Sequence, residues 1–243
     1  MLFSLSYKFA EHCKVMLFDW ILKKAEKRIR DDSIYLWKNL LDFMNPFVIG
    51  ICGGSGSGKT TLLRKISAHL GSSNVSVFTM DNYYFKISKQ RKDQKGIVNF
   101  DLPTALNEQQ LVQDLQRLVE GEEITVQEYF FNSPPDKNVT LTIAPKKVLI
   151  VEGLFLFHYP GVKERIDFSV FVDLNLDTQL ERRIFRDKKS RGYKKEDIIY
   201  QWNNHVTPCY KQFILPYKEQ ASFVFRNDQN AERDFKKLME AIG

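Results

Sequence analysis

Short apolar runs alternate with amphipathic stretches along most of the 243-residue chain. Runs rich in Val, Ile and Phe, with the length of buried parallel strands, occupy 47–52, 75–80, 147–153, 168–174 and 222–226. Stretches in which apolar residues have helical spacing alternate with these runs, at 60–70, 107–120, 178–190, 195–213 and 229–241. This alternation predicts an α/β fold with a doubly wound, mostly parallel sheet. Ligands of such sheets bind beyond the carboxyl ends of the strands.

Two regions depart from the alternation. Residues 124–142 contain two short strand patterns around a turn rich in Asn, Ser and Pro, which predicts an inserted β-hairpin. Residues 1–45 have helical spacing and precede the first strand, so we expect an N-terminal helical extension on a body that spans 46–243. Apolar residues of 15–22 share one face and a basic run follows, which suits packing on the body or on a neighbouring subunit; contact with an anionic membrane is the alternative.

Composition and charge narrow the class of protein. Hydrophobic residues make up 43% and charged residues 27%, an ordinary balance for a soluble domain. Three cysteines without C-x-x-C spacing favour neither a disulfide framework nor a zinc site, so we expect a reducing compartment, the cytoplasm. The net charge is +6, and residues 180–195 carry an excess of the same size. A cluster this concentrated suits a small polyanion better than a nucleic acid, although a solvated helix face also fits.

The most specific motif follows the first predicted strand. It matches the phosphate-binding pattern G-x-x-x-x-G-K-[ST] and comprises Gly53, Gly54, Ser55, Gly56, Ser57, Gly58, Lys59 and Thr60, with Thr61 directly after it. Glycines let backbone N–H groups turn toward phosphate oxygens, Lys59 adds a positive charge, and the Thr60 hydroxyl can bind Mg²⁺. Because the motif lies between a strand and a helix, we predict a P-loop that binds a nucleoside triphosphate.

Acidic residues stand at the ends of two other predicted strands. Asp81 follows 75–80, where a carboxylate can accept a proton from an attacking hydroxyl or bind Mg²⁺ through water; a simple turn residue before Asn82 is the alternative. Glu152 closes 147–153 and can support Mg²⁺ on the side opposite Thr60.

The helix predicted at 178–190 carries a basic flank formed by Arg182, Arg183 and Arg186. We expect Leu180, Ile184 and Phe185 on its other side and Asp177 as its N-cap. Gly192 offers a hinge, so the segment from about 182 to 195 can close over the site and neutralise charge on a transferring phosphoryl group.

From Phe47 to Asn227 the sequence resembles the uridine/cytidine kinase family of P-loop kinases, in particular a bacterial uridine kinase branch. The motifs that carry the resemblance are "DNYYFK" (81–86), "VNFDLPTAL" (98–106), "VEGLFLF" (151–157), "RRIFRDKKSRGY" (182–193) and "HVTPCYKQFILPYKEQAS" (205–222). The resemblance implies a P-loop kinase fold with an Arg-rich lid and an inserted β-hairpin. It also implies Mg²⁺-dependent transfer of the γ-phosphate of ATP or GTP to the 5′-hydroxyl of uridine or cytidine, in pyrimidine salvage, by a homo-oligomer (a dimer or tetramer).

The same resemblance assigns roles to individual residues. Asp81 matches the catalytic base, and Lys59 and Arg186 act with it on the phosphoryl group; Thr60 and Glu152 match the magnesium side. The positions that match groups around the nucleoside are Asp101 and Gln201 (ribose), Arg183 and Arg191 (sugar, phosphate and lid), and Tyr84 and Phe100 (pocket wall).

The departures from the family pattern fall around the base. Gln127 and Asn132 stand where many members have a Tyr and a His, and Tyr193 replaces an arginine of the lid. These departures concern the base, whereas the residues matched to the phosphoryl-transfer chemistry are all present. A sister kinase acting on another alcohol, such as a phosphoribulokinase-like or pantothenate-like enzyme, is one alternative. A nucleotide-dependent binding or membrane-associated module is the other, although neither N-K-x-D nor L-S-G-G-Q is present.

Overall fold

A computed structural model describes residues 45–131 and 138–242. The predicted extension, except for its last residue, lies outside this range. Five parallel strands form the central sheet in the order β2-β5-β1-β6-β7. Their bounds are β1 Phe47–Gly53, β2 Val75–Thr79, β5 Val148–Gly153, β6 Phe168–Asp173 and β7 Phe223–Arg226. All five predicted strands are present, which confirms the doubly wound α/β fold.

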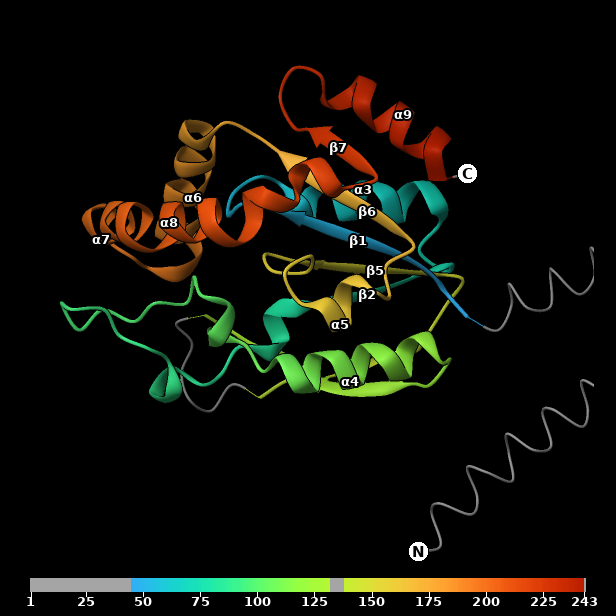
Figure 1. The fold of residues 1–243 in the computed structure, drawn as a ribbon, viewed down its shortest axis with the longest axis horizontal. Coiled ribbons are helices and arrows are strands. Elements are labelled where there is room, and N and C mark those ends of the chain that lie inside the picture. The colour runs from blue at the N-terminus through green and yellow to red at the C-terminus, as the bar shows by residue number, and fades with distance from the viewer. Residues whose placement is uncertain (1–44, 132–137, 243) are drawn as a thin grey trace, which may run out of the picture. The chain divides into compact units, whose positions relative to one another are not determined.

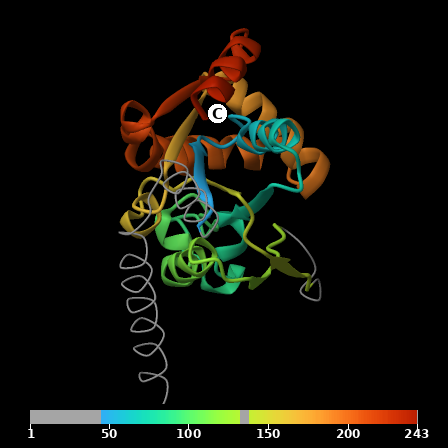
Figure 2. The same ribbon diagram turned by 90° about the vertical axis from the view of Figure 1, so that its right-hand side faces the viewer.

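Strand β1 lies at the centre of the sheet. It pairs with β5 in a register that sets Val48 opposite Leu149, and with β6 in a register that sets Ile51 opposite Val170. Helices α3 (Lys59–Leu70) and α9 (Ala231–Ile242) cover one face, and α4 (Glu108–Val119) and α5 (Pro160–Lys163) cover the other (Figures 1 and 2). Apolar side chains fill both interfaces, because a strand inside a parallel sheet is buried on both of its faces.

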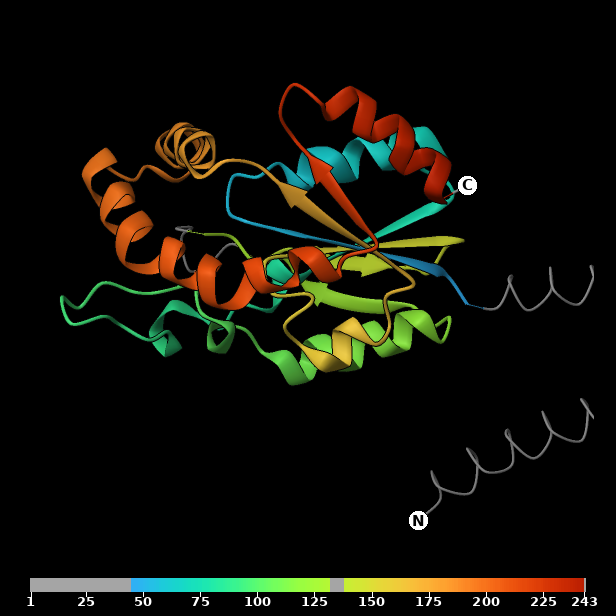
Figure 3. The ribbon, with the colours of Figure 1, turned by 45° about the horizontal axis from the view of Figure 1, so that its top comes forward.

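The remaining helices lie beyond the carboxyl ends of the strands (Figures 1 and 3). Helix α6 is Leu176–Arg191, α7 is Lys195–Gln201 and α8 is Thr207–Cys209. Two π-helical turns, Trp202–Val206 and Tyr210–Ile214, and a 3-10 turn, Leu215–Gln220, continue this segment. The helix expected at 195–213 therefore forms, with two turns wider than an α-helix.

Helix α6 differs from its sequence pattern in two ways. Its N-cap is Asn175, whose side chain accepts a hydrogen bond from the backbone N–H of Thr178 at 2.8 Å, so the expected cap at Asp177 is wrong. Its buried residues are Gln179, Arg183 and Asp187, whereas Phe185 is 70% exposed. Leu180 and Ile184 are half-buried, so α6 buries polar residues rather than apolar ones where it packs against the P-loop.

The inserted hairpin forms as expected. Strands β3 (Ile124–Gln127) and β4 (Thr140–Ile143) are antiparallel, and Val126 pairs with Leu141. The tip, residues 132–137, lies outside the described residues. Among the helices that are described, none combines the length and hydropathy needed to cross a bilayer.

Candidate active site

The P-loop is held in shape by close contacts from two later elements. Gly56 and Gly58 have left-handed backbones, with φ of 81° and 102°. A Cβ on Gly56 would lie 2.5 Å from the carbonyl oxygen of Gln179, and one on Gly58 would lie 2.1 Å from Nδ2 of Asn227. Asn227 Nδ2 also donates a hydrogen bond to the carbonyl oxygen of Ser57 at 2.6 Å. Only glycine fits at these two positions. The contacts with Gln179 and Asn227 hold the loop in this shape without a ligand.

The phosphate side of the site combines a lysine with a hydroxyl–carboxylate pair. Lys59 Nζ donates to the carbonyl oxygen of Gly54 at 3.1 Å. The hydroxyls of Thr60 and Thr79 each lie 3.3 Å from an oxygen of Glu152. Burial raises the pKa of Glu152, and the nearby Lys59 charge opposes that shift. A bound cation would stabilise the ionised form of this buried carboxylate.

The oxygens of Thr60 and Glu152 suit Mg²⁺. This ion prefers oxygen ligands and is commonly bound through one or two protein groups plus substrate phosphates and water. The described residues contain no cluster of three acidic, His or Cys side chains that would hold a metal by itself. A magnesium ion at this position would therefore depend on the phosphates of a bound nucleotide.

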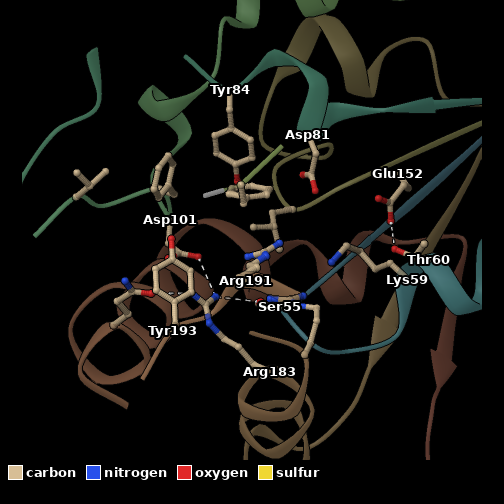
Figure 4. A pocket seen from close by; sticks show the side chains of 16 residues that line it. Ser55, Lys59, Thr60, Asp81, Tyr84, Asp101, Glu152, Arg183, Arg191 and Tyr193 are labelled. Carbon is tan, nitrogen blue, oxygen red and sulfur yellow. Dashed lines mark hydrogen bonds and ion pairs between the residues drawn. The ribbon is translucent and has the colours of Figure 1, made fainter. Parts of the chain in front are cut away.

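Asp81 follows β2 in a 3-10 turn, and its side chain points into the site (Figure 4). Its backbone N–H donates to the hydroxyl of Thr79 at 3.4 Å. Burial raises the pKa of Asp81, and the positive charges of Lys59, Arg191 and Arg186 oppose that shift. A carboxylate with a raised pKa beside cationic groups has the properties of a general base.

Three lid arginines converge on the buried carboxylate of Asp187. Arg186 Nε lies 2.7 Å from Asp187 Oδ1, Arg183 Nε lies 3.3 Å from Oδ2, and Arg191 Nη1 lies 3.5 Å from Oδ1. The Asp187 residue is 0% exposed. Asp187 was not among the predicted site residues, although its spacing of four from Arg183 and from Arg191 is a signal that could have identified it.

Arg183 also connects the P-loop to the predicted ribose side. Its Nη1 donates to Ser55 Oγ at 3.0 Å and lies 3.5 Å from Asp101 Oδ1, while its Nη2 donates to Gln201 Oε1 at 3.3 Å. Both Arg183 and Asp101 are buried. Arg183 thus contacts two other residues assigned to the nucleoside by resemblance, Asp101 and Gln201.

Four aromatic rings form one wall of the site. The rings of Tyr84, Phe100, Tyr129 and Phe131 lie 5.0–6.0 Å apart, centroid to centroid. The guanidinium of Arg191 stacks over Phe131 at 4.1 Å, a cation–π contact. Tyr84 and Phe100 were predicted; Tyr129 and Phe131 were not, although both stand in the hairpin beside the stretch compared with the family.

These groups surround a cavity of about 100 Å³ (Figure 4). Residues predicted from the sequence make up most of its lining: Ser55, Lys59, Thr60, Asp81, Tyr84, Phe100, Asp101, Glu152, Arg183, Arg186, Arg191, Tyr193 and Gln201. Val98, Phe131 and Leu154 complete it and were not predicted. Of the two hairpin residues predicted to meet the base, Gln127 does not line this cavity: it is exposed and donates to Thr140 Oγ1 at 2.8 Å. Asn132 lies outside the described residues.

A second cavity, of about 380 Å³, also borders the P-loop. Its lining comprises Gly56, Gly58, Lys59, Thr60, Thr61, Arg182, Arg186 and Asn227. Lys59, Thr60 and Arg186 line both cavities. A phosphoryl group at this junction would therefore be accessible from either side.

Residues 48–232 match the model of the phosphoribulokinase / uridine kinase family. The chain is 37% identical over 181 residues to a uridine kinase of Proteus mirabilis, covering 73% of this chain and 85% of that protein. It is 32% identical over 180 residues to uridine-cytidine kinase B of Dictyostelium discoideum, covering 74% of each.

Solved structures share the fold. A possible uridine kinase from Bacillus stearothermophilus superposes with a TM-score of 0.51 at 21% identity, covering 81% of this chain and 98% of that one. The phosphoribulokinase of Rhodobacter spheroides superposes with a TM-score of 0.55 at 16% identity, covering 75% of this chain and 70% of that one.

Proposed function

Because the chain belongs to the phosphoribulokinase/uridine kinase family and is thus a phosphotransferase, we propose that it transfers the γ-phosphoryl group of ATP or GTP to the 5′-hydroxyl of uridine, and of cytidine as a second acceptor. The relatives named above as uridine and uridine-cytidine kinases support this choice of acceptor.

The observation that carries the proposal is the pair of cavities with a common wall. A donor nucleotide occupies the larger cavity, with its phosphates on the P-loop, and the acceptor occupies the smaller one. The γ-phosphoryl group then lies at the junction lined by Lys59, Thr60 and Arg186. Phosphoryl transfer requires the charge that develops on the transferring group to be stabilised, and Lys59 and Arg186 can supply that stabilisation here.

In this mechanism Asp81 accepts the proton of the attacking hydroxyl, while Lys59 and Arg186 stabilise negative charge on the transferring group. Thr60 and Glu152 would hold Mg²⁺, which neutralises phosphate charge when it is bound. Burial keeps the pKa of Asp81 above its usual range, which brings it closer to the pH at which a base works best.

Asp101, Gln201 and Arg183 bind the ribose hydroxyls, and the base lies against the aromatic wall of Tyr84 and Phe100. The cavity of about 100 Å³ is smaller than typical ligand pockets of about 300–1,000 Å³. Admission of a nucleoside therefore requires the lid, which includes Arg191, to move outward from the wall.

The edge of the base faces two candidate side chains. Asn132 can offer one donor and one acceptor to a pyrimidine, and Tyr193, which lines the cavity, can offer a ring face or a hydroxyl. Gln127 is not part of this hypothesis in the conformation described, because its amide is bonded within the hairpin. We place the reaction in pyrimidine salvage in the cytoplasm and expect a homo-oligomer, which the mass in solution would test.

The decisive experiment is a screen of acceptor alcohols. Purified enzyme with MgATP would be given uridine, cytidine, purine nucleosides, ribulose 5-phosphate and pantothenate, with ADP release as the readout. We expect turnover with uridine and cytidine. Turnover of a non-nucleoside alcohol with none on either pyrimidine nucleoside would reject this function in favour of a sister kinase, and ATP binding without any transfer would favour a nucleotide-dependent binding module.

A further inference from the structure

Three polar side chains outside both cavities join the acceptor side of the site to the helical segment. Asp93 Oδ2 accepts a hydrogen bond from the hydroxyl of Tyr200 at 2.8 Å and another from Nε2 of His205 at 2.9 Å. These residues, here called the Asp93 cluster, come from parts of the chain more than a hundred residues apart. None of them is used in the mechanism above.

Asp93 also holds its own loop together through hydrogen bonds to the backbone. Its Oδ1 accepts from the backbone N–H groups of Lys95 and Ile97 at 2.8 and 2.9 Å, and its own N–H donates to the carbonyl oxygen of Ile97 at 2.9 Å. Partial burial would raise the pKa of Asp93, but the hydrogen bonds from Ile97, Tyr200, His205 and Lys95 outweigh it and hold that pKa at about 2. The carboxylate is therefore charged and bonded through both oxygens at neutral pH.

The helical side of the cluster depends on a π-helical turn. Tyr200 and His205 are five residues apart, which in an α-helix would set them about 140° apart around the axis. Residues 202–206 instead form a π turn, in which the N–H of Thr207 bonds to the carbonyl oxygen of Trp202. The wider turn brings both side chains to the same carboxylate, and the His205 side chain is only 2% exposed. Such π turns are frequent at functional sites.

The loop fixed in this way carries part of the acceptor cavity. Val98, Phe100 and Asp101 lie a few residues after Asp93 in the same segment, and all line the cavity. The Asp101 N–H donates to Asn99 Oδ1 at 2.9 Å, so a side-chain hydrogen bond also fixes the turn that leads to Asp101. On the helical side, Gln201 is the neighbour of Tyr200 and also lines the cavity.

We propose that Asp93, Tyr200 and His205 are positioning residues for the acceptor substrate: they hold the loop that bears Phe100 and Asp101 against the helix that bears Gln201. We expect a smaller effect on the donor side, because the P-loop has further contacts of its own with Gln179 and Asn227 besides the link through Arg183. The identity of the acceptor rests on the proposed function; the positioning role does not.

The kinetic test compares Tyr200→Phe, Asp93→Ala, His205→Ala and His205→Gln with wild type, with both KM values measured. Loss of the single Tyr200 hydroxyl should raise the acceptor KM about 3- to 10-fold, the effect of one hydrogen bond. Asp93→Ala should raise it more than about tenfold. The ATP KM should stay within about twofold, and His205→Gln, which keeps an N–H donor, should recover most of the loss seen in His205→Ala.

A matched control is His158→Gln. His158 Nδ1 lies 3.2 Å from the hydroxyl of Tyr217, so this His–Tyr pair has similar chemistry but makes no contact with the acceptor loop. It should leave both KM values unchanged. Equal rises in acceptor and ATP KM in the Asp93-cluster variants, or unchanged acceptor KM in all of them, would overturn the proposal.

Hydrogen–deuterium exchange of the ligand-free protein supplies a readout that needs no acceptor. Tyr200→Phe and Asp93→Ala should speed exchange of amides in 91–101 without changing helix α3. Unchanged exchange in 91–101 would refute the positioning role. If the acceptor screen identifies another alcohol, the kinetic test is repeated with that alcohol, so the two proposals fail separately. Should Asp93→Ala prove insoluble, Tyr200→Phe, which loses one oxygen, still decides the outcome.

Discussion

Replacing Asp187 with Asn removes a buried negative charge that three arginines of the lid share. The carboxylate lies 2.7 Å from Arg186 Nε, 3.3 Å from Arg183 Nε and 3.5 Å from Arg191 Nη1. Asn has nearly the same volume and keeps one acceptor oxygen. The substitution therefore changes charge and leaves the packing of α6 almost intact.

The structure sets the size of the expected loss. Removing one partner of a buried ion pair costs about 3–5 kcal/mol. Arg183 keeps Asp101 at 3.5 Å and Asn keeps one oxygen, so we expect a loss near the lower end, about 3 kcal/mol. At about 2–4 °C per kcal/mol for a body of this size, Tm should fall by about 6–12 °C. Because Arg186 loses its closest partner, kcat should fall about 10- to 100-fold.

The assay separates these two effects. Unfolding is followed by circular dichroism, and kcat is measured well below the lowered Tm. Asp234→Asn is the matched control, since Asp234 is also buried and accepts from Arg226 Nε at 2.8 Å and Nη2 at 3.0 Å, but in α9. It should be destabilised by about 1–2 kcal/mol, less than Asp187→Asn because Arg226 is half exposed, with unchanged kcat.

Two results would refute this reasoning. Wild-type kcat in a destabilised Asp187→Asn enzyme would show that the carboxylate supports the fold and does not orient the arginines. An unchanged Tm would show that the three ion pairs contribute nothing to stability.

Four further outcomes are expected. Asp81→Asn should lower kcat about 10²- to 10⁴-fold while nucleotide affinity, measured by calorimetry, stays within about twofold; near-normal turnover would remove Asp81 from the role of base. Asp101→Ala should raise the nucleoside KM and not the ATP KM, and equal effects in a two-substrate assay would count against a ribose contact. The hydrogen bond from Arg226 lowers the pKa of Asp234, so its stabilisation is present above 3.8 and is lost as the pH falls below that value. Urea midpoints of the wild type should therefore drop more steeply below pH 3.8 than those of Asp234→Asn, and parallel curves would contradict this. Deleting residues 1–40 should leave a folded, active kinase, which turnover and mass in solution would check; insoluble protein would show that the extension belongs to the core.

Much of the fold and site follows from local pattern. The five strands are short apolar runs in a parallel sheet, and topology then brings the residues at their carboxyl ends together. For this reason Asp81 and Glu152, which are distant in sequence, could be predicted to lie beside Thr60, and all three line one cavity.

The failures have a common physical cause, which is that partner contacts outweigh the pattern of a single element. The polar residues Gln179, Arg183 and Asp187 of α6 are buried because the P-loop and lid offer hydrogen-bond partners, and Phe185 is exposed as a result. Gln127 is the residue after the inward-facing Val126, so strand alternation turns it outward. Comparison with a family pattern does not register that alternation.

The central position of β1 has a consequence for how the protein is made. Val48 pairs with Leu149 and Ile51 pairs with Val170. Strand β1 therefore leaves the ribosome about a hundred residues before either neighbouring strand. At a synthesis rate of about 5–20 residues per second, this apolar strand spends about 5–20 s without its sheet partners. Long-range parallel pairing of this kind is intrinsically slow and exposes the nascent chain to aggregation. Slower translation between β1 and β5 would lengthen that interval, and the yield of folded enzyme would fall while the activity of each folded molecule stayed the same.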